Sequence, residues 1–270
     1  MVSEDLLADP LEELEFLARS PNRINVLDTL TGGTMGRYEL EDAAGVTRAT
    51  LGRILDDFEV RGWVIEEDRE YATTALGEYV AREFVTLLEH FEPVPALNEV
   101  AQWFPEAGFD FDLEHLRGAR IVRSTRTKPQ APTTLITKRI REAARVRLLT
   151  YAVLPGVMET CWRGAVEGDL EFESIVSSSA YEDFATDPHL LERAAELVQA
   201  DNAEVVFYVG DIPSTVFLVD DAVLLCLSGG EGAPLAVIET TDEVVRTWAE
   251  ESLERYRREG EQVDPSLFTA

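Results

Sequence analysis

The chain has 270 residues, 45% of them hydrophobic, and its 52 acidic and 24 basic residues give a formal net charge of −28. This length and apolar content suffice for two modest domains, each with its own core. Two cysteines without a CxxC spacing argue against a zinc ribbon or a disulfide framework. Without a charged leader or a long apolar run, we expect a cytoplasmic protein outside the membrane, with no metal or cofactor.

The acidic residues are spread through most of the chain, and lysine occurs only as Lys128 and Lys138. This pattern is typical of proteins from salt-in halophiles, in which carboxylates keep the surface hydrated and salt screens their repulsion. An ordinary acidic protein is the alternative. At molar salt the Debye length is about 3 Å, so local arginines can bind DNA on an acidic body. Base-edge and shape readout should then contribute more than counterion release.

The first predicted elements are helical. Apolar residues at helical spacing run from Leu11 to Leu30, and Pro21 begins a second helical segment within this stretch. The glycines of Thr31-Gly32-Gly33 end it.

A pair of shorter helices follows, joined by a sharp turn. Small and apolar residues over 38–44 predict the first helix, and the backbone of Gly45 can turn sharply after it. Thr47 is a good N-cap for the second helix. That helix has one apolar face, formed by Leu51, Ile54, Leu55 and Phe58.

Two strand-like runs complete this part of the chain. Gly62 ends the preceding helix, residues 63–65 and 71–73 predict two strands, and residues 66–70 form the tip between them. The order of elements from Arg37 onward is the outline of a winged helix-turn-helix.

These residues, with the spacing Tyr71-x-x-Thr74-x-x-Gly77, resemble an archaeal winged-helix transcriptional regulator of the broad ArsR/MarR/TrmB kind. The resemblance implies that the second helix of the pair lies in the major groove of double-stranded DNA, with the wing against the flanking backbone or minor groove. Carried over by position, the candidate DNA-binding residues are Tyr38, Thr47, Arg48, Ala49, Thr50, Arg53 and Arg69. Tyr38 would lie near a phosphate, and Arg69 would be the wing contact.

Two arginines and two threonines on the outward face favour DNA, because arginine reads guanine bidentately and threonine can contact a base edge, a methyl group or a phosphate. Two alternatives stay open: a winged domain that assembles with other proteins, and arginines that are merely solvated. The wing departs from the expected pattern, because the acids around Arg69 would be repelled by phosphate. These acids are Glu66, Glu67, Asp68 and Glu70.

A long helix is predicted over residues 74–91, with more apolar surface than a lone winged domain needs. We expect this dimerisation helix to pair across a two-fold axis in a homodimer, which would make the operator palindromic. Packing onto the chain's own second domain is the alternative. Two prolines then mark a boundary. The predicted organisation is a DNA-binding domain at 1–92, a bridge at 93–116 and an α/β ligand-sensing domain at 117–270.

The charge reverses over residues 117–147, which hold ten cations and the single acid Glu142. Three roles for these cations stay open: neutralising acids of the same protein, binding an anionic metabolite, or extending the DNA footprint. The loop 124–129 has amides, hydroxyls and cations that can close over a phosphate or carboxylate. The candidate ligand-binding residues are Arg120, Arg123, Arg126 and Lys128. Residues 138–146 predict a helix and 148–153 a buried strand.

Helices and strands alternate in the rest of the chain, which predicts an α/β domain that ends in meandering strands and a last helix. The predicted strands are 170–176, 203–209, 215–219, 222–227 and 235–239, the helices lie near 156–166, 188–200 and 242–258, and hairpin turns fall at 220–221 and 228–233. This layout is similar to the sensor half of archaeal methanogenesis-type and haloarchaeal two-domain regulators. The expected fold class is α+β / α/β, with an N-terminal winged helix-turn-helix, a connecting long helix and a C-terminal α/β effector-sensing domain.

Motifs for catalysis are missing from the sequence: it has no HExxH, GxSxG or Walker A pattern, and its three histidines leave little material for an acid/base centre. We therefore expect no enzyme and no catalytic residues. The sequence favours a DNA-binding transcriptional regulator controlled by an anionic metabolite. The alternatives are a protein-protein assembly module without specific DNA binding, and an enzyme with a fused regulatory domain. Cys161 and Cys226 are expected to be buried thiols, with redox sensing as the alternative.

Overall fold

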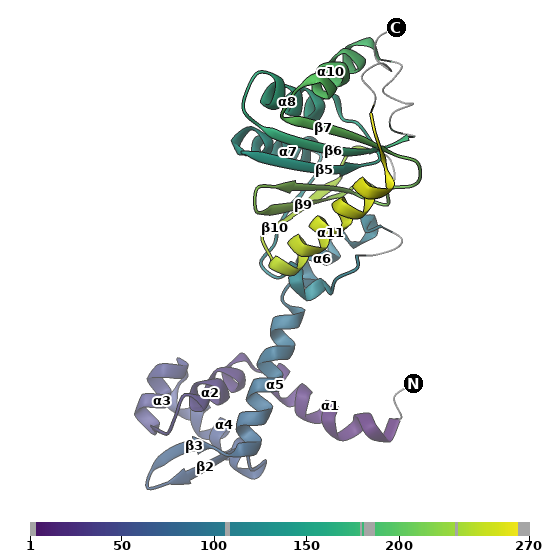
Figure 1. The fold of residues 1–270 in the computed structure, drawn as a ribbon. Coiled ribbons are helices and arrows are strands. Elements are labelled where there is room, and N and C mark those ends of the chain that lie inside the picture. The colour runs from purple at the N-terminus through teal and green to yellow at the C-terminus, as the bar shows by residue number, and fades with distance from the viewer. Residues whose placement is uncertain (1–3, 106–108, 179, 181–186, 230–231, 264–270) are drawn as a thin grey trace. The chain divides into compact units, whose positions relative to one another are not determined.

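The computed structural model describes residues 4–105, 109–178, 180, 187–229 and 232–263, with side chains from residue 10 onward. The chain divides between Phe91 and Glu92 into two compact units (Figure 1). The mixed α+β fold class, with a helical winged unit first and a sheet-containing unit second, is confirmed.

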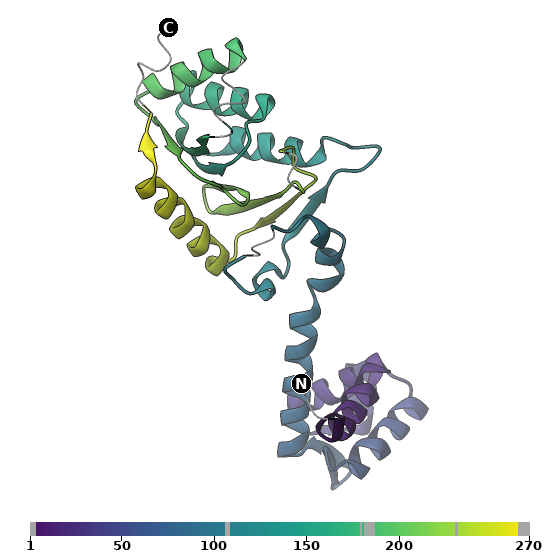
Figure 2. The same cartoon turned by 90° about the vertical axis from the view of Figure 1, so that its right-hand side faces the viewer.

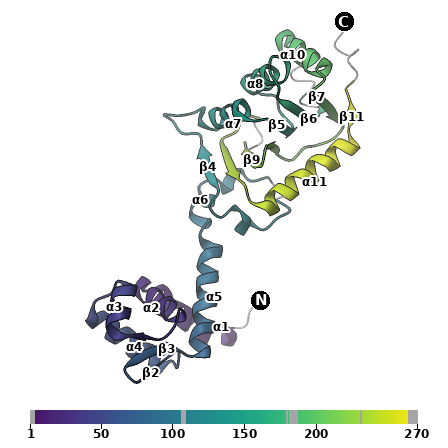
Figure 3. The same cartoon turned by 60° about the vertical axis from the view of Figure 1, so that its left-hand side comes forward.

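The first unit is a winged helix-turn-helix with a small antiparallel sheet, in the strand order β1-β3-β2 (Figure 3). Its elements are α1 (Glu4–Ala18), α2 (Pro21–Thr31), β1 (Met35–Gly36), α3 (Arg37–Ala44), α4 (Arg48–Val60), β2 (Val64–Glu67), β3 (Glu70–Thr73) and α5 (Ala75–Phe91). The predicted helix boundaries are confirmed to within one or two residues, including the break before Pro21, except that α1 begins at Glu4 and not at Leu11. Strand β1 was not predicted, because two residues carry no periodicity.

Local signals in the sequence account for the helix-turn-helix. Gly45 ends α3 with a left-handed backbone at φ 65°, a conformation that glycine adopts without strain. Thr47 caps α4, and its Oγ1 accepts a hydrogen bond from the Thr50 N–H at 3.4 Å. The side chains that α4 buries are the predicted ones, Leu51, Ile54, Leu55 and Phe58.

The start of α5 is fixed against the wing. Thr74 Oγ1 donates a hydrogen bond to the Gly62 carbonyl oxygen at 2.6 Å and accepts one from the Gly77 N–H at 3.1 Å. A Cβ atom on Gly77 would lie 2.0 Å from the carbonyl oxygen of Trp63, so only glycine fits there. The helix buries Ala81 and Phe84 and leaves several large apolar side chains exposed. The exposed ones are Leu76, Tyr79, Leu87, Leu88 and Phe91.

The second unit begins with the residues that were expected to form a bridge. They contain α6 (Val94–Asn98) and two short 3-10 turns at Ala101–Trp103 and Leu113–Leu116. Leu97, Val100 and Leu116 are buried in the core of this unit. The described residues of 93–116 therefore pack as part of the second unit.

The remaining elements form an eight-stranded mixed sheet with helices on both faces. They are β4 (Arg120–Arg123), α7 (Ala131–Glu142), β5 (Arg145–Thr150), α8 (Pro155–Val166), β6 (Glu171–Ser177), α10 (Pro188–Gln199), β7 (Ala203–Tyr208), β8 (Thr215–Val219), β9 (Ala222–Leu227), β10 (Ala236–Thr240), α11 (Glu243–Glu259) and β11 (Glu261–Gln262). The strand order is β11-β7-β6-β5-β8-β9-β10-β4. Strands β5, β6 and β7 are parallel, and the other neighbouring pairs are antiparallel.

Two cores lie on opposite faces of this sheet. Helix α11 covers one face, where its residues Val245, Ala249 and Leu253 pack against the strands. Helices α7, α8 and α10 cover the other face (Figure 2). Because side chains alternate along a strand, neighbouring residues of β5 and β6 contribute to different cores.

Most predicted elements of this unit are confirmed, and those of the cation-rich segment need correction. The helix predicted at 138–146 runs instead over Ala131–Glu142, because Pro132 stands in its first turn, where proline suits a helix. The strand predicted at 148–153 is β5, which begins at Arg145. Strands β4 and β11 were not predicted. The hairpin predicted at 228–233 lies partly outside the described residues, at 230 and 231.

Candidate nucleic-acid interface

The first two turns of α4 hold five of the predicted DNA-binding residues. Thr47, Arg48, Ala49 and Arg53 are exposed, and Thr50 is half-buried. The hydroxyls of Thr47 and Thr50 lie 3.0 Å apart. Among the described residues, Arg48 and Arg53 form no ion pair and no hydrogen bond through their side chains. Both guanidinium groups are therefore available to a partner.

Other arginines of the first unit are engaged in packing. Arg23 Nη2 lies 3.4 Å from Asp57 Oδ2, and its guanidinium lies 3.8 Å from the ring centre of Phe16. Arg61 Nε lies 2.9 Å from Glu13 Oε2, and the Arg61 guanidinium lies 3.6 Å from the ring centre of Phe16. These cation-π contacts and ion pairs are structural. They set Arg48 and Arg53 apart from the arginines that hold the unit together.

The start of α3 adds a residue that was not predicted. Arg37 is half-buried, and its Nη2 would lie 2.6 Å from a Cβ atom on Gly52 of α4. Its Nε is buried and donates no hydrogen bond to a described residue. Tyr38 beside it is 77% exposed. The sequence does carry a signal for Arg37, because it is a basic residue in the first turn of α3.

The tip of the wing is a two-residue turn, narrower than the predicted 66–70. Asp68 and Arg69 both have positive φ, at 51° and 71°. Such turns favour glycine at the second position, and another residue there costs about 1–2 kcal/mol. Arg69 is exposed at this strained position. Glu67 and Glu70, also exposed, pair across the two strands next to it.

In the second unit, the structure separates two of the four predicted ligand-binding residues. Arg120 and Arg123 stand three residues apart on β4, so their side chains leave opposite faces of the sheet. Arg120 Nη1 lies 3.4 Å from Glu239 Oε2, a carboxylate that also binds Arg139. Arg123 Nε lies 3.1 Å from Glu99 Oε2. For these cations the structure shows neutralisation of acids of the same protein.

Arg126 and Lys128 lie in the predicted loop, which closes on itself. The backbone N–H of Lys128 donates to the Thr125 carbonyl oxygen at 3.1 Å, and the Thr125 N–H donates to the Lys128 carbonyl oxygen at 3.3 Å. Within the described part of the chain, neither cation forms an ion pair. Lys128 lines an open hollow of about 480 Å³ together with Arg120 and Lys138. The structure thus brings Arg120 and Lys128 together, but not all four predicted residues.

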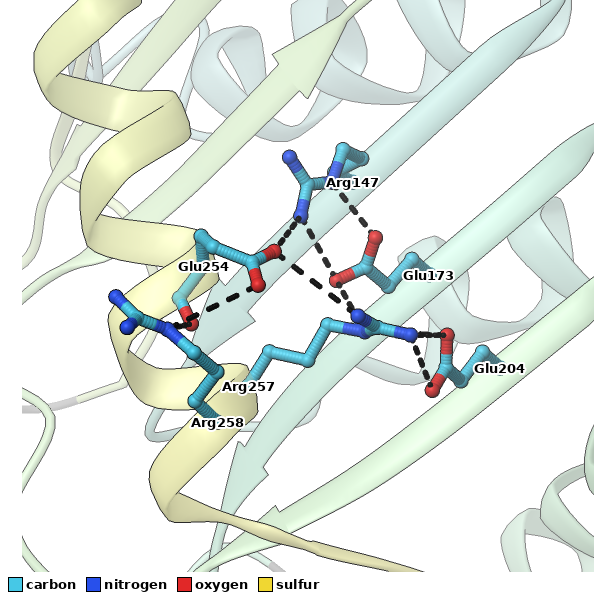
Figure 4. A network of polar contacts seen from close by, with 6 residues as sticks. All are labelled: Arg147, Glu173, Glu204, Glu254, Arg257 and Arg258. Atoms are coloured by element: carbon cyan, nitrogen blue, oxygen red, sulfur yellow. Dashed lines mark hydrogen bonds and ion pairs between the residues drawn. The ribbon is translucent and has the colours of Figure 1, made fainter.

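A charged cluster uses another cation of the same segment to hold α11 on the sheet (Figure 4). Arg147 binds Glu173 bidentately, with Nε to Oε2 at 2.7 Å and Nη2 to Oε1 at 3.0 Å. Both side chains are nearly buried, at 13% and 12% exposed. Arg257 of α11 reaches Glu204 at 3.0 Å, and Glu254 lies 3.8 Å from Arg147. These contacts join α11 to β5, β6 and β7.

Both cysteines are buried and free. Burial raises the pKa of Cys161 and of Cys226 to about 12. At neutral pH both are therefore protonated thiols, which react slowly with oxidants.

Two family models match the chain, one in each unit. Residues 11–94 match the HVO_A0261 N-terminal domain, and residues 129–259 match the middle domain of the methanogenesis regulatory protein FilR1. The predicted resemblance to archaeal two-domain regulators is confirmed by these matches. No curated protein matches the chain by sequence.

Solved structures show weaker likenesses. The archaeal chromatin protein TrmBL2 is 13% identical at a TM-score of 0.42, over 97% of this chain and all of its own. The phospholipase D family member Nuc from Salmonella typhimurium is 13% identical at 0.42, over 54% of this chain and 98% of its own. The MarR family regulator SPO1453 from Silicibacter pomeroyi is 22% identical at 0.26, over 42% and 85%. At these scores no function transfers.

No helix in the described part of the chain has the length and apolar content needed to cross a bilayer.

Proposed function

Because the chain is a two-domain protein similar to archaeal regulators, with an HVO_A0261-type N-terminal domain followed by a FilR1-type middle domain, we propose that it is a sequence-specific DNA-binding transcriptional regulator. One observation carries the proposal. Arg48 and Arg53 stand exposed and unengaged on the first turns of α4, in a unit where Arg23 and Arg61 are committed to packing.

In the proposed complex the first half of α4 enters the major groove. Arg48 and Arg53 read base edges, since a guanidinium can bind guanine bidentately, and Thr47 and Thr50 contact bases or phosphates beside them. Ala49 lies one helical turn before Arg53 on the same side of the helix and lets the backbone approach the DNA.

Two further contacts position the domain on the DNA backbone. Arg37 and Tyr38, at the start of α3, are proposed to bind phosphate, and the 77% exposure of Tyr38 supports this role. Arg69 at the wing tip is proposed to bind the flanking backbone or minor groove. The strained conformation of Arg69 supports the proposal, because strained residues persist mainly at functional sites.

A homodimer is part of the proposal. The exposed apolar side chains of α5 give it a surface that a lone winged unit does not need. Pairing of two such helices across a two-fold axis would bury them and place two copies of α4 on a palindromic site. Sedimentation of the full chain at molar salt, with Leu87→Glu and Leu88→Glu as a disrupting pair, tests the dimer.

An anionic effector is a second element, supported by a narrower set of residues than the sequence suggested. Arg120, Lys128 and Lys138 line one open hollow, and these cations can bind phosphate or carboxylate there. Isothermal titration at molar salt with phosphorylated and carboxylate metabolites tests this element. A heat of binding that is lost in Lys128→Ala would support the effector site. No heat of binding with any of these metabolites would reject it.

The proposal assigns no reaction to the chain. His115 faces Asp242 at 3.3 Å, and His189 faces Glu159 at 4.0 Å, so each of these histidines has a carboxylate partner of its own. Turnover of a generic phosphodiester substrate by the purified chain would contradict this part of the proposal.

Chromatin immunoprecipitation in the native host tests the regulator itself. The tagged protein is compared with Arg48→Ala/Arg53→Ala and with a control of equal charge change, Arg19→Ala/Arg163→Ala, whose side chains are 72% and 65% exposed and lie outside α4 and α5. We expect sharp promoter peaks that vanish only in the first variant. In vitro, two lost base contacts should weaken operator binding at least roughly 30-fold.

Specific DNA reading would be rejected by the absence of discrete peaks under varied growth conditions, or by an equal loss of promoter peaks in both variants. A winged-helix module that assembles with other proteins would then be favoured.

A further inference from the structure

The second unit has a largely enclosed cavity between its sheet and helices α7, α8 and α10. Its volume is about 60 Å³, and none of the cations discussed above lines it. Apolar side chains from the strands and from all three helices form most of its wall. They include Leu148, Phe172, Phe217, Ile136, Val157 and Leu197. Thr150 and Val176 place the cavity beside the carboxyl ends of the parallel strands β5 and β6, the edge at which α/β sheets commonly bind ligands.

Most polar groups in the wall are already satisfied. The Thr150 hydroxyl donates to the Ala152 carbonyl oxygen at 2.6 Å and accepts from the Ala152 N–H at 3.1 Å. Its remaining lone pair accepts from the Thr215 hydroxyl at 2.9 Å, because the single Thr150 proton is already used. The Ser228 hydroxyl is bound to the Tyr151 hydroxyl.

Ser174 is the exception. It lies on β6 between Phe172 and Val176, lines the cavity, and is 4% exposed. Its hydroxyl forms no hydrogen bond with a described residue. The hydroxyl is thus accessible from the cavity and has no partner among the described residues, so it can hydrogen-bond with a molecule held there.

Charge is absent from the described residues that line the cavity. Cys161 and Cys226 belong to the wall, and burial keeps both as neutral thiols because it raises their pKa to about 12. A charged ligand would lose its hydration there without gaining a counter-charge. The chemistry of the wall therefore selects against anions, in contrast to the hollow at Lys128.

We propose that this cavity binds a small, uncharged, largely apolar molecule whose single hydroxyl or carbonyl oxygen hydrogen-bonds with Ser174. An engineered apolar cavity of about 150 Å³ holds benzene, so about 60 Å³ suits a molecule of a few heavy atoms, such as a short alcohol or ketone. The flexible thioether of Met158 in the wall can adjust to it. The binding of this molecule in the cavity does not depend on the proposed function. Only the control of DNA affinity by this ligand rests on it.

The sequence offers an internal probe for the test. Of its three methionines, Met158 lines the cavity and Met35 lies in the first unit. The full chain with labelled methionine methyl groups is titrated by NMR at molar KCl with 1-propanol, with xenon and with propionate. We expect saturable shifts of Met158 but not of Met35 with 1-propanol and xenon, in the range of about 0.1–10 mM for so few atoms, and none with propionate.

Variants distinguish the contribution of the Ser174 hydroxyl to binding from that of the cavity volume. Ser174→Ala keeps the cavity and should weaken 1-propanol roughly 2- to 10-fold while leaving xenon unchanged. Ala194→Leu fills the cavity from α10 and should abolish both, and Ser174→Val fills it from the sheet if the leucine variant does not fold. Ile175→Val is the matched control, because Ile175 belongs to the core on the other face of β6.

Three results would overturn the inference: propionate binding as well as 1-propanol, equal shifts of Met158 and Met35, or binding that survives filling of the cavity. Operator affinity is measured with and without 1-propanol in the same samples. Saturable binding at Met158 in a protein that reads no specific DNA would support the cavity site and reject the proposed regulator.

Discussion

Replacing Arg147 by methionine should destabilise the second unit strongly. The methionine keeps much of the apolar stem and removes the guanidinium that binds Glu173 through two hydrogen bonds. Glu173 is 12% exposed, so its carboxylate would be left largely desolvated beside α11 (Figure 4). Breaking a buried ion pair by removal of one partner costs about 3–5 kcal/mol.

The remaining contacts of Glu173 set the expected magnitude. Arg257 Nε lies 3.8 Å from Glu173 Oε1 and still offers partial compensation. We therefore expect the lower end, about 3 kcal/mol, which for a unit of this size corresponds to roughly 6–12 °C in melting temperature. Differential scanning calorimetry of the full chain at molar KCl measures it.

A matched control lies two residues away on the same strand. Arg145 pairs with Glu171 as Arg147 does with Glu173, in the same register of β5 and β6. Its Nε is 3.8 Å from the carboxylate, and the side chains are 62% and 70% exposed. Such exposed pairs contribute about 0–1 kcal/mol and are screened by salt. Arg145→Met should therefore shift the melting temperature little at molar KCl.

Comparison with a double variant completes the test. Arg147→Met/Glu173→Leu removes both charges and should recover most of the lost stability, because replacing a buried pair by apolar residues is often neutral. Equal costs for Arg147→Met and Arg145→Met, or a double variant less stable than Arg147→Met, would refute the reasoning from burial.

Three further outcomes are expected. Burial acts to raise the pKa of Asp242, but hydrogen bonds from the first amides of α11 and from His115 outweigh it and lower the pKa, so its stabilisation is present above about pH 4 and is lost as pH falls through the lowered value. Asp242→Ala should cost about 1 kcal/mol at neutral pH and flatten the acid limb of melting temperature against pH; an unchanged limb would contradict this. Arg69→Gly should stabilise the first unit by about 1 kcal/mol in urea unfolding while weakening operator binding, and a destabilised variant would remove the argument from strain. Cys161 and Cys226 should resist iodoacetamide until the chain unfolds, and rapid alkylation of the native protein would revive redox sensing.

The sequence predicts best those elements whose causes are local. For α4, the glycine before it, the threonine cap and the apolar face all lie within a few turns of one another, and the helix forms as expected. The strands from β6 to β10 were found in the same way, because each is a short apolar run bounded by turn residues. Strand β1 has two residues and leaves no such pattern.

The roles of individual cations depend on partners far away in the chain. Arg120 and Arg123 look equivalent in the sequence, yet pairing of β4 with β10 places Arg120 at Glu239 and sends Arg123 to Glu99 on the other face. The free hydroxyl of Ser174 was invisible for the same reason, because its surroundings come from several strands and helices.

The place of β4 at the end of the sheet also bears on the order of events during synthesis. Among the described strands β4 pairs only with β10, which the ribosome makes much later, so β4 cannot enter the sheet until this distant partner has been made. The first unit ends at Phe91, so all of its residues are made before the second unit begins. Since domains generally fold as units from the N-terminus, the winged unit should be native on the ribosome while the unit proposed to control it is still incomplete.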